Sequence, residues 1–414
     1  MSGQLQLSFV TYKRDAFIQV EGKENVQRFF IIKQGKVRIS KEVQVVAEEG
    51  GNILGPGDFF GVVSSMSSHT HIETARAVTD VVLISVYRDQ YSELIQNNTP
   101  VAMKVIMQFS KRLRYLDEAL SRLTSKSGSS RASVTHLFEV GEYYARQGQY
   151  KQAFYAYSKY IENCPEGAET ASVRERMMKI AAYVSGVRTS FGPEEFNRAY
   201  PKDTMLFAEE EPGDELFVIQ KGSVKIVKIV NDSEVLLAVL KAGDIFGEMA
   251  LLEAKPRVAS AIAHEDCQVL TVSRANFQHM ITTQPQLIAR LTILLADRIW
   301  YIYKQLANTL ITDPVGRLYD LFCIQFEKNR IPFTSTTSFS FDFGPKDLAN
   351  MLGLSHDETN RALKKMLDNK TIQIVRNKIY IPTVVEIIRQ AESYRRMQRI
   401  EQARKESRAQ NTQL

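Results

Sequence analysis

The chain repeats one strand-and-turn pattern, and this internal repeat restricts the fold more than any other feature of the sequence. In the first copy FFIIKQGKVRIS precedes LGPGDFFG, and in the second LFVIQKGSVKIV precedes LKAGDIFG. Gly57 and Gly243 are 186 residues apart, and so are Gly61 and Gly247. Short alternating apolar strands that turn at glycines predict an antiparallel β-roll or barrel in each copy.

A long helix is predicted after each copy, because apolar residues there step by four and three positions. Such a seam is typical of coiled-coil packing. We expect the two helices to pair within one chain, or each to pair with the same helix of a second subunit. Packing of each helix on its own roll alone is the alternative. The seam positions are Ala102, Ile106, Phe109, Leu113, Leu116, Leu120 and Leu123, and Ile288, Thr292, Leu295, Ile299, Ile302, Leu306 and Thr309.

Length and composition indicate a multidomain protein of ordinary soluble type. The 414 residues are 44% hydrophobic and 24% charged, enough for about two to four domains. No uninterrupted apolar run reaches the roughly 18 residues of a membrane span. The start, MSGQLQLSFVTYKRD, lacks a signal-peptide pattern. We therefore expect a cytoplasmic protein without membrane contact.

Cysteines and histidines indicate neither a disulfide framework nor a metal site. Cys164, Cys267 and Cys323 form no C-x-x-C pair, so we expect reduced, buried thiols. Only His69 and His71 lie close together, and we expect no metal there. The net charge is +6, and the basic segments RALKKM and YRRMQRIEQARKESRAQ favour a polyanionic partner.

The segment between the two copies predicts a linker followed by a small helical element. TSKSGSSRAS has the composition of a flexible linker. The next segment fits one tetratricopeptide repeat, and residues 169–186 are expected to add a covering helix. A peptide groove needs several repeats, so we favour a spacer or docking element that contacts a protein partner. The matching positions are Gly141, Tyr144, Gly148, Tyr150, Ala153, Tyr157 and Pro165.

In the second copy, FGEMALLEAKPRVAS places a glutamate and an arginine around a short apolar turn. We expect a short helix from Glu248 to Leu252, after Gly247, which allows a ligand to approach closely. The first N–H groups of this helix and the guanidinium of Arg257 suit a phosphate diester. Glu248 suits a ribose hydroxyl. Together they suit a compact nucleotide with one negative charge and a free 2′-hydroxyl.

This segment resembles the phosphate-binding cassette of cyclic nucleotide-binding domains, over GDIFGEMALLEAKPRVASAIA and the preceding DELFVIQKGSVKIV. The resemblance implies that Glu248 binds the ribose 2′-hydroxyl and Arg257 the cyclic phosphate. It also implies help from the backbone N–H groups of Met249, Ala250 and Val258. The spacing of glycine and arginine is similar to the kinase-regulatory version, whereas bacterial cyclic-AMP receptors have one residue more and a serine at the position of Val258. An ordinary turn with a surface arginine is the alternative.

The first copy lacks both side chains. Val62 stands at the offset of Glu248, and His71 at that of Arg257. Val62 offers no acceptor to a ribose, and a histidine is mostly neutral at pH 7 unless its pKa is raised. We predict a degenerate copy kept for packing or dimerisation. Binding of a different small ligand is the alternative.

The C-terminal region predicts two helices joined by a glycine turn and followed by a hairpin. The first helix, residues 346–352, ends at Gly353, and the second begins after Ser355, a favourable N-cap. TIQIVRNKIYI alternates and turns between Arg376 and Lys378. This order indicates a helix-turn-helix. We expect Thr359, Ala362, Leu363, Met366 and Leu367 to face inward, and His356, Asp357, Asn360, Arg361 and Lys364 to face outward.

This region resembles the winged helix-turn-helix of the cyclic-AMP receptor/FNR family of bacterial regulators, and the resemblance extends over residues 190–384. Its specific parts are DPVGRL and LGLS…ETNRALKKML. It implies that His356, Asp357 and Arg361 read base edges, where the cyclic-AMP receptor has Arg, Glu and Arg. Arg361 suits guanine, and Asp357 a cytosine amino group. The remaining candidates for DNA contact are Ser355 and Asn360 on the helix and, for phosphates, Lys364, Lys365, Arg376 and Lys378.

The resemblance leaves the base of the nucleotide open. In the family, the long helix presents polar side chains to the base, and an ungapped alignment from DPVGR puts Ile302 and Tyr303 there. Tyr303 suits stacking or one hydrogen bond. We expect cyclic AMP in preference to cyclic GMP, and no metal. Iron–sulfur sensing of the FNR kind lacks its cysteine cluster here.

The predicted fold class is α+β multidomain. It comprises two jelly-roll-like β-rolls with long C-terminal helices, a tetratricopeptide-like helical insert and a winged helix-turn-helix. We expect a cyclic nucleotide-responsive transcription regulator that binds double-stranded DNA as a homodimer through its long helices. A scaffold protein whose winged domain reads no specific DNA is the alternative, and no enzyme motif is found. The predicted segments are residues 1–125, 126–187, 188–310, 311–385 and a basic tail at 386–414.

Overall fold

The computed structural model describes residues 8–24, 27–41, 52–124, 135–192, 194–230, 232–341 and 343–411. All but the first residue of the predicted linker at 124–133 lies outside these ranges.

Each copy of the repeat folds into two four-stranded antiparallel sheets, with the strands in the same order. The first roll has the orders β1-β8-β3-β6 and β2-β7-β4-β5, and the second has β9-β16-β11-β14 and β10-β15-β12-β13. A register irregularity also recurs, between Ile32 and Gln34 in β3 and between Ile219 and Lys221 in β11. The predicted rolls are confirmed.

The strands of each roll alternate with turns, as the glycine pattern predicted. The first roll contains β1 (Ser8–Tyr12), β2 (Phe17–Gln19), β3 (Arg28–Gln34), β4 (Val37–Ser40), β5 (Ile53–Leu54), β6 (Phe59–Phe60), α1 (Val62–Ser67), β7 (Thr74–Ala77) and β8 (Val81–Tyr87). The second contains β9 (Asn197–Tyr200), β10 (Met205–Phe207), β11 (Glu215–Lys221), β12 (Ser223–Val230), β13 (Ser233–Lys241), β14 (Ile245–Phe246), α7 (Glu248–Glu253), β15 (Ser260–Ala263) and β16 (Cys267–Ser273).

Alternate side chains of both sheets point inward and form the core of each roll. Phe30 and Ile32 in the first roll correspond to Phe217 and Ile219 in the second, and all four are at most 3% exposed. Inward-facing residues at every second position are what a two-layer roll requires. The repeat therefore preserves the core positions as well as the turns.

The long helices divide between two compact units. Helices α2 (Tyr91–Asn97) and α3 (Thr99–Thr124) follow the first roll, and α8 (Arg274–Thr283) and α9 (Pro285–Thr309) follow the second. Each roll shares its unit with part of the long helix that follows the other roll. One unit is Met1–Gln90, Tyr115–Lys126 and Ala296–Leu414, and the other is Tyr91–Arg114 and Ser127–Leu295.

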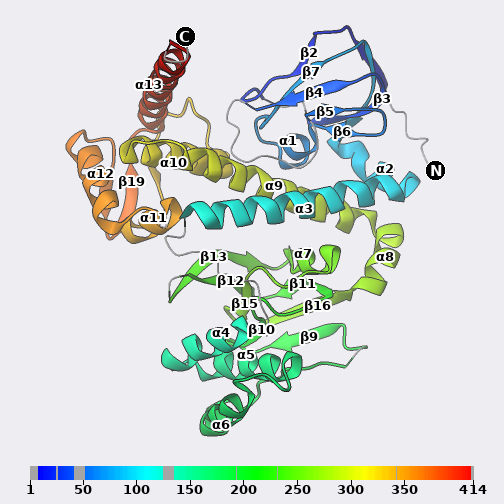
Figure 1. Cartoon of the computed structure of the whole chain (residues 1–414), viewed down its shortest axis with the longest axis vertical. Coiled ribbons are helices and arrows are strands. Elements are labelled where there is room, and N and C mark those ends of the chain that lie inside the picture. Colours follow the sequence, from blue (N-terminus) through cyan, green and yellow to red (C-terminus); the bar gives the residue numbers. More distant parts are fainter. Residues whose placement is uncertain are drawn as a thin grey trace. The chain divides into compact units, whose positions relative to one another are not determined.

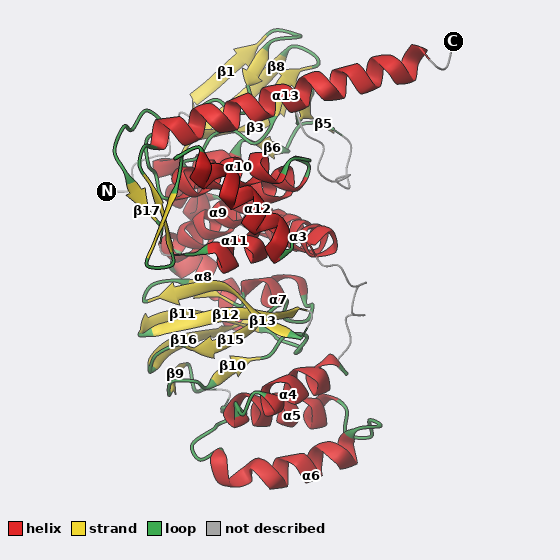
Figure 2. Cartoon of the chain, turned by 90° about the vertical axis from the view of Figure 1, so that its left-hand side faces the viewer, coloured by secondary structure: helices red, strands yellow, loops and turns green. Residues whose placement is uncertain are grey.

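The insert consists of α4 (His136–Arg146), α5 (Tyr150–Asn163) and α6 (Thr170–Ile180). A Cβ atom at Gly141 would lie 2.4 Å from the Tyr157 ring, so only glycine allows α4 and α5 to pack this closely. The apolar core of the insert continues into the second roll at Met205, Ala208, Val227 and Ile262. Figures 1 and 2 show α4 and α5 beside β10.

The C-terminal part packs around α10 (Pro314–Lys328). Asp313 caps this helix, because its side chain accepts hydrogen bonds from the N–H groups of Val315 and Gly316. It contains β17 (Phe339–Ser340), α11 (Pro345–Leu352), α12 (His356–Asp368), β18 (Gln373–Val375) and β19 (Lys378–Ile381). The final helix α13 (Val384–Asn411) packs on α10, and Arg395 pairs with Asp320 at 2.9 Å. This helix occupies residues for which only a basic tail was expected.

Candidate functional site

A glycine in a left-handed conformation starts the short helix of the second roll. Gly247 has a φ of 77°, and a Cβ atom there would lie 2.8 Å from Nη1 of Arg257. Both the backbone angle and the close approach favour glycine. The helix that follows, α7, begins at Glu248 as predicted, and Ala254 ends it with a φ of 54°. The polypeptide therefore returns to Arg257 within a few residues.

Arg257 is almost completely buried beside this helix. Its side chain is 5% exposed, and Nη1 donates to the carbonyls of Glu215 (2.8 Å) and Gly247 (2.6 Å). The guanidinium carbon lies 4.3 Å from the centre of the Phe207 ring. A Cβ atom at Gly213 would come within 2.3 Å of Nε. Nε itself has no hydrogen-bond partner and is almost inaccessible to solvent.

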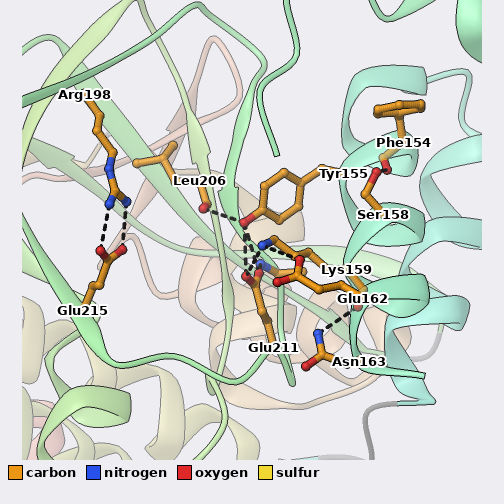
Figure 3. A network of polar contacts seen from close by, with 11 residues as sticks. Phe154, Tyr155, Ser158, Lys159, Glu162, Asn163, Arg198, Leu206, Glu211 and Glu215 are labelled. Carbon is orange, nitrogen blue, oxygen red and sulfur yellow. Dashed lines mark hydrogen bonds and ion pairs between the residues drawn. The ribbon is translucent and has the colours of Figure 1, made fainter. Parts of the chain in front are cut away.

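Buried carboxylates surround this cation. Burial lowers the pKa of Arg257, and the negative charges of nearby groups, chiefly Glu211, oppose that shift. Burial raises the pKa of Glu211, which accepts hydrogen bonds from the Ala208 N–H (2.9 Å) and the Tyr155 hydroxyl (3.2 Å). Figure 3 shows Tyr155 directed from α5 toward Glu211. The insert thus contacts a carboxylate that belongs to the surroundings of Arg257.

The structure brings together the predicted residues of the cassette. Glu248, 2% exposed, is the first residue of α7, and its charge contributes to the field at Arg257. Met249 and Ala250 follow in α7 and are 4% and 2% exposed. Val258 is partly buried directly after Arg257. These residues therefore form one continuous site at the start of α7.

Tyr303 is part of α9, in the unit that contains the first roll. Its hydroxyl donates to Glu21 of the first roll at 3.3 Å, and the Lys41 ammonium lies 5.1 Å from the centre of its ring. These contacts belong to the unit that contains the first roll. A role for Tyr303 at a nucleotide in the second roll stays a prediction.

The first roll has the same backbone arrangement with different side chains. The Glu210 N–H donates to the Arg257 carbonyl, and the Arg257 N–H to the Glu211 carbonyl, both at 2.9 Å. In the first roll, the Gly22 N–H donates to the His71 carbonyl (2.8 Å) and the His71 N–H to the Lys23 carbonyl (2.9 Å). His71 therefore occupies the position of Arg257, as the sequence offset predicted.

Val62 opens α1 in the first roll, as Glu248 opens α7 in the second. Burial lowers the pKa of His71, and Glu73 opposes the shift. A neutral imidazole therefore replaces the guanidinium, and an apolar side chain replaces the carboxylate.

Helix α3 supports the cassette of the second roll, which the sequence did not reveal. Glu253, the last residue of α7, accepts from the Ser110 hydroxyl at 2.8 Å and pairs with Arg114 at 3.0 Å. Arg114 also donates to the Pro256 carbonyl (3.4 Å), next to Arg257. Ser110 and Arg114 are four residues apart beside the apolar seam. In the sequence, this spacing was the one sign that the two residues act together, and it did not point to Glu253.

The candidate DNA-contacting residues lie on α12 and on the hairpin. Ser355 caps α12 through a capping box with Glu358. Thr359, Ala362, Leu363 and Met366 are at most 3% exposed. The remaining candidates form an exposed face: His356, Asp357, Asn360, Arg361, Lys364 and Lys365.

Arg376 and Asn377 form the tight turn between β18 and β19, and both have left-handed backbone angles. Arg376 and Lys378 are exposed at this turn. The two-helix and hairpin pattern is therefore present, and its inward and outward faces agree with the prediction.

Comparisons with known proteins identify the rolls. A model of the cyclic nucleotide-binding domain matches residues 9–98 and 197–284. A CRP-like cAMP-activated global transcriptional regulator of Mycobacterium tuberculosis is 26% identical over 193 residues, which cover 46% of this chain and 86% of that protein. The chain is a homologue of the cyclic-AMP receptor/FNR regulators and carries two cyclic nucleotide-binding domains. The cAMP-activated global transcriptional regulator CRP of Escherichia coli is 26% identical over 42% of this chain and 83% of its own length.

Among solved structures, a mutant of CooA from Carboxydothermus hydrogenoformans is similar to this chain with 19% sequence identity and a TM-score of 0.39. The matched part is 47% of this chain and 87% of the CooA chain. No helix in the described part of the chain has the length and apolar character of a membrane span. Within the same residues, no three histidine, cysteine, aspartate or glutamate side chains are grouped to hold a metal.

The contact between α3 and the cassette makes a local prediction. Arg114→Met would leave Glu253, whose side chain is 3% exposed, with Ser110 and the exposed Lys255 as partners. We expect the cassette to open more easily by about 1–3 kcal/mol. Hydrogen exchange of peptides covering residues 248–257 should accelerate about tenfold or more.

Arg122→Met on the same helix, where the arginine is 72% exposed, is the matched control and should leave exchange unchanged. The double variant Arg114→Met/Glu253→Gln should recover part of the protection. Equal exchange in Arg114→Met and the unaltered chain would show that α3 does not support the cassette.

Proposed function

We propose that this chain is a cyclic nucleotide-responsive transcription regulator that binds its nucleotide in the second roll and reads DNA with α12. The observation that carries the proposal is the buried Arg257 guanidinium, with its unused Nε, beside Glu248. A desolvated cation with a free donor is suited to an anion. The bacterial relatives are cAMP-activated regulators, which favours cyclic AMP over cyclic GMP as the nucleotide of this chain.

In this proposal each cassette residue has one task. Arg257 donates to the cyclic phosphate, and Glu248 accepts from the ribose 2′-hydroxyl. The carboxylate must face the sugar, because it would repel the phosphate. Backbone N–H groups of Met249, Ala250 and Val258 complete the cradle. To bind the phosphate, Arg257 gives up backbone carbonyl contacts, and this change acts on neighbouring Glu211 and hence on Tyr155 of the insert.

The proposed role of the insert is that of a tetratricopeptide-like docking element. Its contacts with the second roll support that role: Tyr155 donates to the Leu206 carbonyl at 2.9 Å, Tyr144 to Glu234 at 2.9 Å, and Lys159 lies 3.6 Å from Glu211. An insert held by both apolar and polar contacts senses changes in the roll. Its outer surface is available to a protein partner.

Helices α11 and α12 with the β18–β19 hairpin act as a winged helix-turn-helix. The exposed polar face of α12 and the basic hairpin turn support this assignment. A homodimer would place two α12 helices in successive major grooves, and the nucleotide acts by binding one arrangement more tightly than the other. The protein acts in the cytoplasm as a regulator and catalyses no reaction.

Calorimetry with cyclic AMP and cyclic GMP tests the nucleotide site. Arg257→Ala removes a charge-assisted donor and should weaken cyclic AMP binding by about 10- to 100-fold. Glu248→Gln preserves shape and removes the ribose acceptor charge, and we expect a loss of about tenfold. Arg146→Ala is the matched control, because this arginine is 60% exposed and pairs with exposed Asp232. Equal affinity in Arg257→Ala and Arg146→Ala would refute the site.

Selection of binding sequences from randomised duplex DNA tests the reading helix. Arg361→Ala should reduce affinity for the selected sequence by about 1–3 kcal/mol and relax the preference at one base pair. Arg389→Ala, which removes the same charge from the exposed face of α13, should leave the preference intact. An unchanged preference in Arg361→Ala would count against base reading by α12. Salt-independent binding would favour the scaffold alternative.

A further inference from the structure

The first roll contains a cavity at the position that Arg257 occupies in the second roll. The cavity measures about 240 Å³ and is lined by residues of β2, β3 and the loop after β2, together with His71. Ligand pockets for drug-sized molecules are about 300–1,000 Å³, so this cavity suits a smaller molecule. Its walls include the apolar side chains of Phe17, Ile18 and Phe30.

Two buried polar atoms in the cavity wall have no partner. His71 is 8% exposed and its Nδ1 makes no hydrogen bond, and Gln19 is 6% exposed and its Oε1 makes none. The amide nitrogen of Gln19 donates to the Glu73 carbonyl at 3.3 Å, which fixes Oε1 as an acceptor. Buried polar groups in native proteins are nearly always paired. Both atoms belong to residues that line the cavity but have almost no accessible surface of their own. A small shift of the Gln19 side chain would present Oε1 to a ligand that supplies a hydrogen-bond donor.

The charges at this position are reversed between the two rolls. The matching backbone hydrogen bonds place Lys23 of the first roll at the position of Glu211 in the second. The first residue of β3 is Arg28, and the first residue of the equivalent strand β11 is Glu215. Two cations thus replace two carboxylates. Lys23 and Arg28 both line the cavity, with Glu24 as the one carboxylate among the lining residues.

We propose that the first roll binds a small organic anion that carries a hydroxyl or amino group and a short apolar body, in place of a cyclic nucleotide. Lys23 and Arg28 attract the anionic head, Gln19 Oε1 accepts from the donor group, and the apolar wall accommodates the body. Val62 stands where the second roll has Glu248, and the buried carboxylate at the start of α1 is that of Glu73, which accepts from the Gly61 N–H at 3.5 Å. The site is independent of nucleotide binding in the second roll.

Residues next to His71 contact α9 and α10, so ligand binding at His71 can affect these two helices. The Thr70 hydroxyl donates to Glu327 of α10 at 2.7 Å, and its N–H to the same oxygen at 3.3 Å. The His69 ring stacks on Trp300 of α9 with the ring centres 4.0 Å apart. A ligand that orders His71 therefore acts on α9 and α10 through its two preceding residues. Trp300 is the single tryptophan of the chain and reports on this contact.

The test uses the full chain and three matched, optically transparent probes: α-hydroxyisovalerate, isovalerate and isoamyl alcohol. Calorimetry measures binding, and Trp300 emission shows whether the first roll responds. We expect the hydroxy acid to bind most tightly, the plain acid more weakly and the alcohol not at all. Lys23→Gln should weaken binding of the hydroxy acid by about tenfold or more.

Two control variants locate the site. Lys36→Gln removes an exposed charge of the first roll outside the cavity and should preserve binding. Arg257→Ala should also preserve it, which separates this proposal from nucleotide binding in the second roll. Absence of binding of the hydroxy acid, equal binding in Lys23→Gln, or its displacement by cyclic AMP in the Arg257→Ala chain would each overturn the proposal.

Discussion

A buried guanidinium is the constraint on which the second roll depends. Removing a cation from water is costly unless the surroundings compensate for the lost hydration. Around Arg257 two backbone carbonyls, the face of Phe207 and a set of carboxylates headed by Glu211 supply that compensation. Gly213 and Gly247 are glycines because the guanidinium occupies the space of their missing side chains. Nε remains without a hydrogen-bond partner, and in the proposed function this guanidinium binds the anion.

The two rolls contact different helices of the chain. The second roll contacts the insert through Tyr155 and α3 through Glu253, and α9 starts in the same unit. The first roll contacts the far part of α9 and α10, through His69 and Thr70. Helix α9 begins in one unit and ends in the other. The proposed ligands of the two rolls would therefore act through different contacts.

Local patterns in the sequence were sufficient for the rolls, the cassette and the capped helix α12. Gly57 and Gly61 with their repeats fix the turns, and Ser355 with Glu358 fixes a helix start. These signals act over a few residues, so a single sequence carries them. The same holds for His71, whose position followed from counting residues.

Other features depend on residues far apart in the chain and have no local signature. The pairing of Arg114 with Glu253 joins positions 139 residues apart, and neither residue stands out in its own segment. The hydrogen bond from the Tyr303 hydroxyl to Glu21 likewise joins positions 282 residues apart. Helix α13 was missed because its sequence is polar, and its first turns are held by packing on α10. The cavity beside Lys23 required a comparison of the two folded rolls.

A crystal structure of the full chain with cyclic AMP would show whether Arg257 and Glu248 bind the nucleotide. We expect one nucleotide per chain, in the second roll, with its phosphate bound by Arg257 and its ribose 2′-hydroxyl by Glu248. A nucleotide beside His71 in the first roll, or one in the second roll that leaves Arg257 on its backbone carbonyls, would contradict this expectation.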